Sequence, residues 1–283
     1  MSDTDVTTAL SPQVLNDGRS IPPVGFGSFP HHGEDSEEMV TNALDLGYRL
    51  IDTALRYENE AEVGAAVRRS SVPRDEIVVT SKLAGRHHGR EAAREGVRES
   101  LRNLGLERID LFLIHWPLPK VGKFVDTWKT LVDLRDEGVL GSIGVSNFTP
   151  AHLETIVDAT GVVPAVNQVE LHPAFPQAEL RAAHAELGVV TEAWSPLGRG
   201  TGLLDEPVIA EIAEAHGVTT GQAVLRWHVQ QGIVPIPMSS SPARRKANLE
   251  LDGFALTDDE VAAIAGLDRG RIWGQDPDEH EEF

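Results

Sequence analysis

Proton-exchanging side chains follow several apolar segments of this chain, each near the point where its segment ends. Asp52, Lys82 and His115 occupy such positions, and Tyr57 lies shortly beyond Asp52. A carboxylate, an amine, an imidazole and a phenol are groups that accept, donate and stabilise protons. If the fold brings them together, they could carry out general acid–base chemistry.

Each of these residues also has an ordinary structural interpretation. Asp52 could cap a helix, Lys82 could be a surface lysine, and His115 could be a hydrogen-bonded core histidine. Asn147 could cap the helix that follows Phe148. Taken singly, each ordinary interpretation is favoured, but capping does not explain why an acid, an amine, a histidine and a tyrosine should converge.

Other polar side chains follow the remaining apolar segments in the same way. In a barrel of parallel strands the carboxyl ends form one ring around one mouth, where enzymes of this architecture keep their sites. We therefore expect one shared site rather than scattered polar residues. The further members of this ring are Ser146, Asn147, Gln168, Glu170, Ser195, Ser239 and Ser240.

The apolar segments have the length of strands, and longer amphipathic stretches separate them. Their apolar character is mostly continuous, as a strand covered on both faces requires. In residues 90–104 the apolar side chains recur at helical spacing, and the repeat approaches one strand per ~30 residues, as in βα units. The predicted strands are 24–27, 48–51, 77–80, 109–114, 140–145, 165–169, 189–193 and 233–236.

Eight such units allow a closed barrel or a doubly wound open sheet. Gly25-Phe26-Gly27 ends the first strand, but no third glycine opens a helix, so we interpret it as a tight turn rather than a dinucleotide fingerprint. No Gly/Ser/Pro-rich linker divides the chain. We predict one α/β domain over residues 13–283, a (β/α)8 TIM barrel whose bottom is closed by an N-terminal β-hairpin around Asp17-Gly18, preceded by a disordered arm at residues 1–12.

Composition excludes several classes of function. The net charge of −19 argues against nucleic-acid and membrane partners, and the absence of cysteine excludes disulfides and thiol chemistry. The N-terminal residues lack the pattern of a secretory signal, and no apolar run reaches the ~20 residues of a membrane helix. We expect a cytoplasmic protein.

Several motifs together resemble the aldo-keto reductase family, in its order and spacing, from about residue 15 to residue 267. The style is closest to bacterial members that reduce keto sugars, glyoxals and other small carbonyls. The motifs are Gly47-Tyr48-Arg49-Leu50-Ile51-Asp52-Thr53-Ala54 with Tyr57 and Asn59-Glu60, Leu113-Ile114-His115-Trp116-Pro117, Gly144-Val145-Ser146-Asn147-Phe148, Asn167-Gln168-Val169-Glu170, Trp194-Ser195-Pro196-Leu197-Gly198, and Ile236-Pro237-Met238-Ser239 with Arg244 and Asn248.

The resemblance implies an NADPH-dependent reductase of aldehydes and ketones that acts as a monomer. A nicotinamide supplies the hydride, since no side chain can. Tyr57 matches the general acid, Lys82 the cation that lowers its pKa, and Asp52 the carboxylate that holds the lysine charged. His115 matches the residue that hydrogen-bonds the substrate oxygen.

The resemblance also assigns residues to the cofactor and the substrate. Trp194 matches the aromatic that stacks on the nicotinamide, and Ser146, Asn147 and Gln168 match the groups that hold its carboxamide. Phe29, Trp116 and Trp273 are expected to wall the substrate pocket. The phosphates and the adenosine are assigned to Ser195, Leu197, Gly198, Ser239, Ser240, Arg244 and Asn248.

Three positions depart from the family pattern, among them Ala247, which precedes Asn248 where an acidic or amide residue is common. Met238 replaces the lysine that contacts the 2′-phosphate, so we expect NADPH to be preferred less strongly and NADH to be usable. Ala84 replaces a tryptophan, which leaves the pocket to be closed by another group, with Trp273 as the candidate. The acidic end of the chain, residues 278–283, is expected to be mobile and solvated.

Three other functions remain open at this level. A class I aldolase would use Lys82 as a Schiff base on the same barrel. A redox sensor without turnover would resemble the potassium-channel β subunits. A metal hydrolase would need ligands, but His31-His32 and His87-His88 lack the spacing, so we expect surface loop histidines and no metal.

Overall fold

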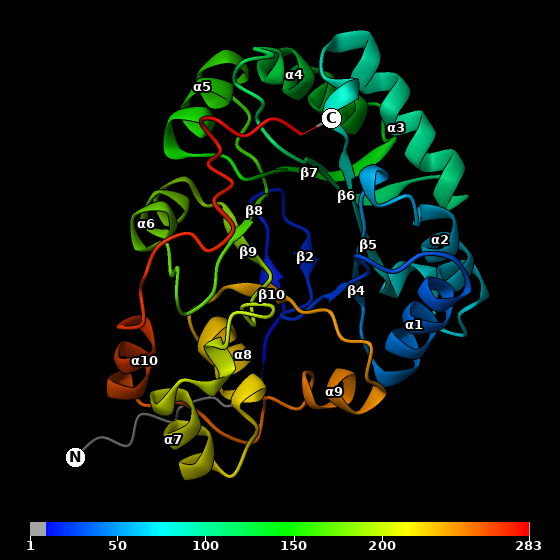
Figure 1. Cartoon of the computed structure of the whole chain (residues 1–283). Helices are drawn as coiled ribbons and strands as arrows, with labels where there is room; N and C mark the ends of the chain where they lie inside the picture. The colour runs from blue at the N-terminus through cyan, green and yellow to red at the C-terminus, as the bar shows by residue number, and fades with distance from the viewer. Residues whose placement is uncertain (1–9, 283) are drawn as a thin grey trace.

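The computed structural model describes residues 10–282. Its centre is a parallel sheet of eight strands in sequential order from β3 to β10 (Figure 1). Two backbone hydrogen bonds, from Gly25 to Pro235 (3.0 Å) and from Gly27 to Pro237 (3.2 Å), join the two edges into a barrel. The strands are β3 (Phe26–Gly27), β4 (Leu50–Asp52), β5 (Val78–Leu83), β6 (Ile109–Ile114), β7 (Leu140–Ser146), β8 (Val166–Glu170), β9 (Val190–Trp194) and β10 (Val234–Ile236).

Helices surround this barrel and connect successive strands. The α-helices are α1 (Gly33–Leu46), α2 (Glu60–Arg69), α3 (Arg90–Leu104), α4 (Phe124–Asp136), α5 (Pro150–Thr160), α6 (Ala178–Leu187), α7 (Pro207–His216), α8 (Thr220–Gln230), α9 (Pro242–Ala247) and α10 (Asp258–Ala265). Short 3-10 turns are η1 (Leu55–Tyr57), η2 (Arg74–Glu76), η3 (Gly85–His87) and η4 (Leu203–Asp205). The predicted (β/α)8 barrel is thus confirmed, with all eight expected strands present.

Local sequence explains how the helices begin and which face they bury. Thr149, Thr219 and Thr257 accept a backbone hydrogen bond at the starts of α5, α8 and α10 and complete capping boxes. Ser241 caps α9, which has proline at its first turn. In α3 the buried face includes Ala93, Val97 and Leu104, which pack against the strands.

The two glycines near the first strand serve closure of the barrel rather than a turn. Phe26 and Gly27 form β3 itself, so the interpretation of this segment as a tight turn was wrong. A Cβ at Gly25 would lie 2.5 Å from Ile236 Cδ1, and one at Gly27 would lie 3.4 Å from the Ile236 side chain. The missing side chains let β3 approach β10 closely enough to hydrogen-bond.

An N-terminal hairpin of β1 (Gln13–Val14) and β2 (Ser20–Ile21) covers the end of the barrel opposite the carboxyl ends of the strands. Its Leu15 and Ile21 side chains are buried with residues inside the barrel. Asn16 donates to Pro164 O (2.9 Å), which precedes β8. The hairpin therefore closes the bottom of the barrel, as predicted.

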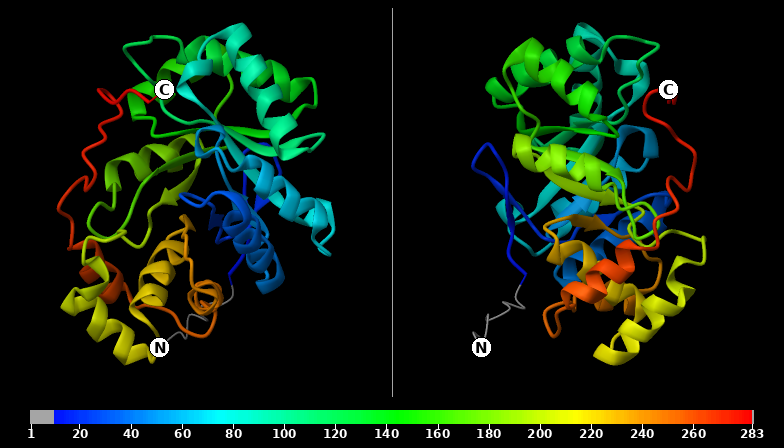
Figure 2. Two further views of the ribbon diagram at one scale, coloured as in Figure 1. Left: turned by 45° about the vertical axis from the view of Figure 1, so that its right-hand side comes forward. Right: turned by 90° about the vertical axis from the view of Figure 1, so that its left-hand side faces the viewer.

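The C-terminal segment, residues 266–282, crosses the other end of the barrel, opposite the hairpin (Figure 2, right). The expectation of a mobile, solvated end was wrong for residues 278–282, because Lys120 donates its backbone N–H to Glu281 (3.0 Å) and Glu282 pairs with Arg56. Phe283 lies outside the described residues.

The start of the chain lies only partly within the structure. Of the arm expected at residues 1–12, residues 1–9 lie outside the described residues. Leu10 donates its N–H to Asp252 (2.7 Å) and packs against the core, so the held chain begins before residue 13. Between residues 10 and 282, every helix is too short or too polar to cross a bilayer.

Candidate active site

A buried ion pair between neighbouring strands forms the floor of the site. Lys82, in β5, directs Nζ at both carboxylate oxygens of Asp52 at the end of β4, at 2.6 and 2.8 Å. The same ammonium donates to Thr53 O at 3.0 Å. Burial by itself would lower the pKa of Lys82, but Asp52 and the other acidic groups nearby outweigh it and raise the pKa above its ordinary value. The lysine is therefore a fixed cation.

Tyr57 ends the η1 turn after β4 and lies above this pair. Its hydroxyl is 3.5 Å from Lys82 Nζ, and the ammonium lies 5.0 Å from the ring centroid. Burial raises the pKa of the phenol, and the carboxylates of Asp52 and Glu282 raise it further, while Lys82 lowers it. The expected lowering by Lys82 is present but does not prevail, so Tyr57 carries its proton at neutral pH.

His115 follows β6 and faces Tyr57 across the site. The two ring centroids are 5.7 Å apart in an edge-to-face arrangement. Burial, together with the positive charges of Lys82 and Arg56, holds the pKa of His115 well below its ordinary value. A neutral imidazole has one N–H, which it can donate to a substrate oxygen.

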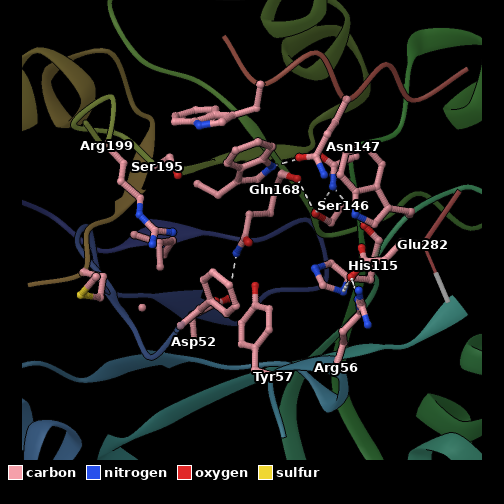
Figure 3. A pocket seen from close by; sticks show the side chains of 18 of the residues that line it. Asp52, Arg56, Tyr57, His115, Ser146, Asn147, Gln168, Ser195, Arg199 and Glu282 are labelled. Carbon is pink, nitrogen blue, oxygen red and sulfur yellow. Dashed lines mark hydrogen bonds and ion pairs between the residues drawn. The ribbon is translucent and has the colours of Figure 1, made fainter. Parts of the chain in front are cut away.

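Three of these side chains border one cavity of about 810 Å³ at the carboxyl ends of the strands, as Figure 3 shows for Asp52, Tyr57 and His115. Lys82 lies directly beneath the cavity, wholly buried. The four groups expected to meet therefore do meet. A phenol backed by a fixed ammonium, beside a neutral imidazole, can protonate an oxygen that gains negative charge.

Amide side chains and a tryptophan form the next part of the cavity wall. Trp194, at the end of β9, donates its indole N–H to Asn147 Oδ1 at 2.8 Å. The Asn147 amide donates to His115 O (3.1 Å) and to Ser146 Oγ (3.0 Å). Asn147 itself adopts a left-handed conformation (φ 62°), and its side chain borders the cavity. These contacts fix the orientation of the indole face beside Gln168.

The residues expected to contact phosphates and adenosine extend away from this wall. Ser195 and Leu197 border the cavity, whereas Gly198 does not. Ser239 accepts from Arg244 Nε (3.0 Å) at the start of α9. Ser240 and Arg244 are exposed and Asn248 is buried at the end of that helix. This second group lies outside the cavity, past Met238, which borders it.

The three aromatic residues expected in the substrate pocket all border the cavity. Phe29 lies 4.9 Å from the Tyr57 ring, is 45% exposed and so is a wall residue rather than core. Trp273 packs 5.4 Å from Trp194. The space beside Ala84 is filled differently from the expectation, because a Cβ on Gly85 would lie 1.8 Å from Glu282 O. The end of the C-terminal segment, at Glu282, closes that side, whereas Trp273 of the same segment lies beside Trp194.

Six charged residues of the site were missed by sequence reasoning. Five border the cavity, and Glu192 lies buried beside Gln168. Glu192 did carry a signal, since it is an acid inside a mostly apolar strand. The others are charged residues in loops or in the η1 turn, where charge is ordinary. The five at the cavity are Arg56, Glu58, Arg199, Glu281 and Glu282.

The adjacent histidine pairs do not form a metal site. His32 borders the cavity and His87 pairs with Glu99 (3.0 Å), while His88 is buried, so the expectation of a surface position was wrong for His88. Within residues 10–282, no group of three His, Cys, Asp or Glu side chains could hold a metal ion.

Comparison with known proteins agrees with this geometry. Residues 24–269 match the model of the Aldo/keto reductase family. The chain is 56% identical over 269 residues to 2,5-diketo-D-gluconic acid reductase B of Corynebacterium sp. (strain SHS752001), covering 95% of this chain and 97% of that one. It is 43% identical over 266 residues to methylglyoxal reductase DkgA of Escherichia coli (strain K12), covering 94% and 96%.

Solved structures show the same architecture. A crystal structure of a Gox0644 mutant in complex with NADPH superposes with a TM-score of 0.92 at 43% identity, covering 96% of this chain and 99% of that chain. Family model, full-length relatives and superposed structure all agree. The chain belongs to the aldo/keto reductase family and is an NAD(P)H-dependent oxidoreductase that reduces carbonyl compounds.

Proposed function

We propose that this protein uses NADPH to reduce small aldehydes and ketones to alcohols, with Tyr57 as the proton donor. The observation that carries the proposal is the meeting of Tyr57, Lys82, Asp52 and His115 at one cavity. NADPH supplies the hydride when bound. The protein residues hold the carbonyl group of the substrate and protonate its oxygen.

Tyr57 is suited to give up its proton only as charge develops. Its pKa is raised while the site is at rest, so it remains a phenol. When negative charge grows on the substrate oxygen, the phenol donates its proton to that oxygen, and Lys82, 3.5 Å away, stabilises the phenolate left behind. Asp52 keeps Lys82 protonated and aimed. His115 donates a hydrogen bond that orients the carbonyl.

The same contacts argue against an aldolase. A Schiff-base lysine must lose its proton and reach the substrate. Lys82 is wholly buried, contacts both oxygens of Asp52, and has a raised pKa. It is therefore an electrostatic group and not a nucleophile.

The cofactor assignment rests on the wall formed by Trp194, Asn147, Ser146 and Gln168. A flat indole beside fixed amides suits a nicotinamide ring and its carboxamide. The pyrophosphate is assigned to the loop of Ser195, Leu197 and Gly198, to which we add Arg199, an exposed cation over Phe29 (5.7 Å). The adenosine and its 2′-phosphate are assigned to Ser239, Ser240, Arg244 and Asn248.

We infer that NADPH is preferred over NADH, though less strongly than where a lysine replaces Met238. Arg244 retains a guanidinium held at Ser239. For substrates, the names of two relatives suggest a diketo acid or methylglyoxal, both small and polar. We infer a cytoplasmic monomer from the family resemblance and the cysteine-free composition.

An assay of NADPH absorbance with a panel of small carbonyl compounds tests the proposal. Wild type should consume NADPH in steady turnover, whereas Tyr57→Phe should bind the cofactor but turn over poorly. The matched control is Tyr48→Phe, since Tyr48 is the chain's other tyrosine and donates to Arg245 O (2.9 Å) outside the cavity. A single slow oxidation without turnover would instead indicate a redox sensor.

A further inference from the structure

The C-terminal segment is fastened across the mouth of the barrel at two places. Ile272 donates its backbone N–H to Glu170 Oε1 (2.7 Å) at the end of β8. Further along, Lys120 donates its backbone N–H to Glu281 Oε1 (3.0 Å). This path carries Glu282 into the cavity that the catalytic residues border.

Glu282 lies beside three side chains there, and it pairs most closely with Arg56. Its Oε1 is 2.5 Å from Arg56 Nε and 3.7 Å from His115 Nδ1. Burial raises the pKa of Glu282. The charges of Arg56 and Lys82 and a hydrogen bond from Trp116 act against that rise. Figure 3 shows the pair of Arg56 and Glu282 beside His115. A carboxylate thus already lies where a substrate must lie.

Arg56 has no other carboxylate partner in the part of the chain that the structure describes, residues 10–282. Its side chain is 49% exposed, whereas that of Glu282 is 15% exposed. The guanidinium precedes the proton donor Tyr57 directly in η1, so its place relative to the reacting atoms is set by the same turn. When Glu282 leaves, a cation next to the catalytic phenol becomes available.

We propose that Arg56 forms a subsite for the carboxylate of the substrate, and that Glu282 occupies this subsite until an acidic substrate displaces it. The inference rests on the proposed function and narrows it: the favoured substrates are carbonyl compounds that carry a carboxylate. Glu282 stands in for that group in the resting protein.

The charges of the protein support an acid-binding role for Arg56. The chain carries a net charge of −19, so its field repels an anionic substrate. A guanidinium presents several N–H donors in a plane that matches a carboxylate. Glu282, tethered at high effective concentration, competes with that substrate and keeps the subsite paired between turnovers.

The test compares succinic semialdehyde with its methyl ester, which differ by one negative charge at similar size. kcat/KM is measured for both in wild type, Arg56→Met, Glu282→Gln and Glu279→Gln. Glu279 is the matched control, since it removes the same charge from an exposed position outside the cavity. NADPH affinity, followed by quenching of tryptophan fluorescence, should be unchanged in all four.

We expect Arg56→Met to lower the ratio of acid to ester kcat/KM about tenfold, the loss of one charged hydrogen bond. Glu282→Gln should raise that ratio about threefold, and Glu279→Gln should leave it unchanged. Succinate, an unreactive acid, should inhibit Glu282→Gln more strongly and Arg56→Met more weakly than wild type.

The subsite would be overturned if Arg56→Met changed kcat/KM equally for acid and ester, so that their ratio stayed the same. If Glu279→Gln matched Glu282→Gln, the effect would be one of overall charge and the displacement by substrate would be wrong. Failure of the proposed function looks different, because wild type would then consume NADPH with neither compound.

Discussion

Gln168 donates its side-chain amide to Glu192 Oε2 at 2.8 Å inside the barrel, and the same nitrogen donates to Asp52 Oδ2 at 2.9 Å. An amide has its donors at one end and its acceptor at the other. With the nitrogen held by two carboxyl groups, the oxygen of Gln168 must face away from them. Glu192 thereby helps to orient a residue that we assign to the cofactor.

Glu192→Gln should alter the pH dependence of stability. Burial and the charge of Asp52 raise the pKa of Glu192 from 4.5 to about 7. Between these values only the folded state keeps the proton, so the free energy of unfolding declines as pH rises. The stabilisation is complete below pH 4.5 and lost above about pH 7.

The change across that window is on the order of 3 kcal/mol. As pH rises from 4.5 to about 7, wild type should therefore lose this much free energy of unfolding relative to Glu192→Gln. Urea unfolding of both proteins at several pH values measures the difference. Glu170→Gln is the control, because Glu170 is equally buried but lies in the cluster with His172. Parallel curves for wild type and Glu192→Gln would contradict the assignment.

Lys82→Met should separate stability from activity. Removing the lysine leaves the buried Asp52 carboxylate without its cation, which costs about 3–5 kcal/mol of stability. The double variant Asp52→Asn/Lys82→Met removes both charges, so thermal unfolding should show much of that loss recovered. Turnover should fall roughly 10²–10⁴-fold in both, because Tyr57 loses the group that stabilises its phenolate. Recovered turnover in the double variant would exclude this role for Lys82.

The strands and the ends of strands were predictable because their signals are local. A buried parallel strand needs continuous apolar residues, and a polar residue at its end, such as Asp52 or His115, is visible without knowing any partner. The hairpin around Asp17-Gly18 carries its turn in its own sequence. These features specified the eight strands and the polar residues at their carboxyl ends, such as Asp52, Lys82 and His115.

Other features depend on partners that are distant in the chain. The segment containing Glu279, Glu281 and Glu282 has the composition of a solvated end, and only the position of Arg56 and Lys120 makes it a cover for the cavity. Likewise, the glycine at position 25 matters because Ile236 packs on it. Such pairings are set by the closed barrel and not by local propensity.

Met238→Lys should tighten binding of NADPH. Met238 borders the cavity just before Ser239, where we assign the 2′-phosphate. A lysine there adds one charged contact, which corresponds to about tenfold in Kd. NADH lacks that phosphate and should gain less. Val14→Lys, an exposed position on the hairpin, adds the same charge far from the site and should change neither Kd. Equal gains for both cofactors in Met238→Lys would place the 2′-phosphate elsewhere.

His88→Leu should make the protein more resistant to acid. Neither ring nitrogen of His88 has a hydrogen-bond partner among residues 10–282, and burial with the nearby Lys123 lowers its pKa from 6.5 to about 4. The folded state therefore keeps His88 neutral while the unfolded state takes up a proton below pH 6.5. This stability is present above pH 6.5 and is lost as pH falls through about 4, by up to about 3 kcal/mol. Urea unfolding at pH 7, 5 and 4 should show the variant gaining on wild type as pH falls, and a constant difference would mean that His88 does not oppose acid stability.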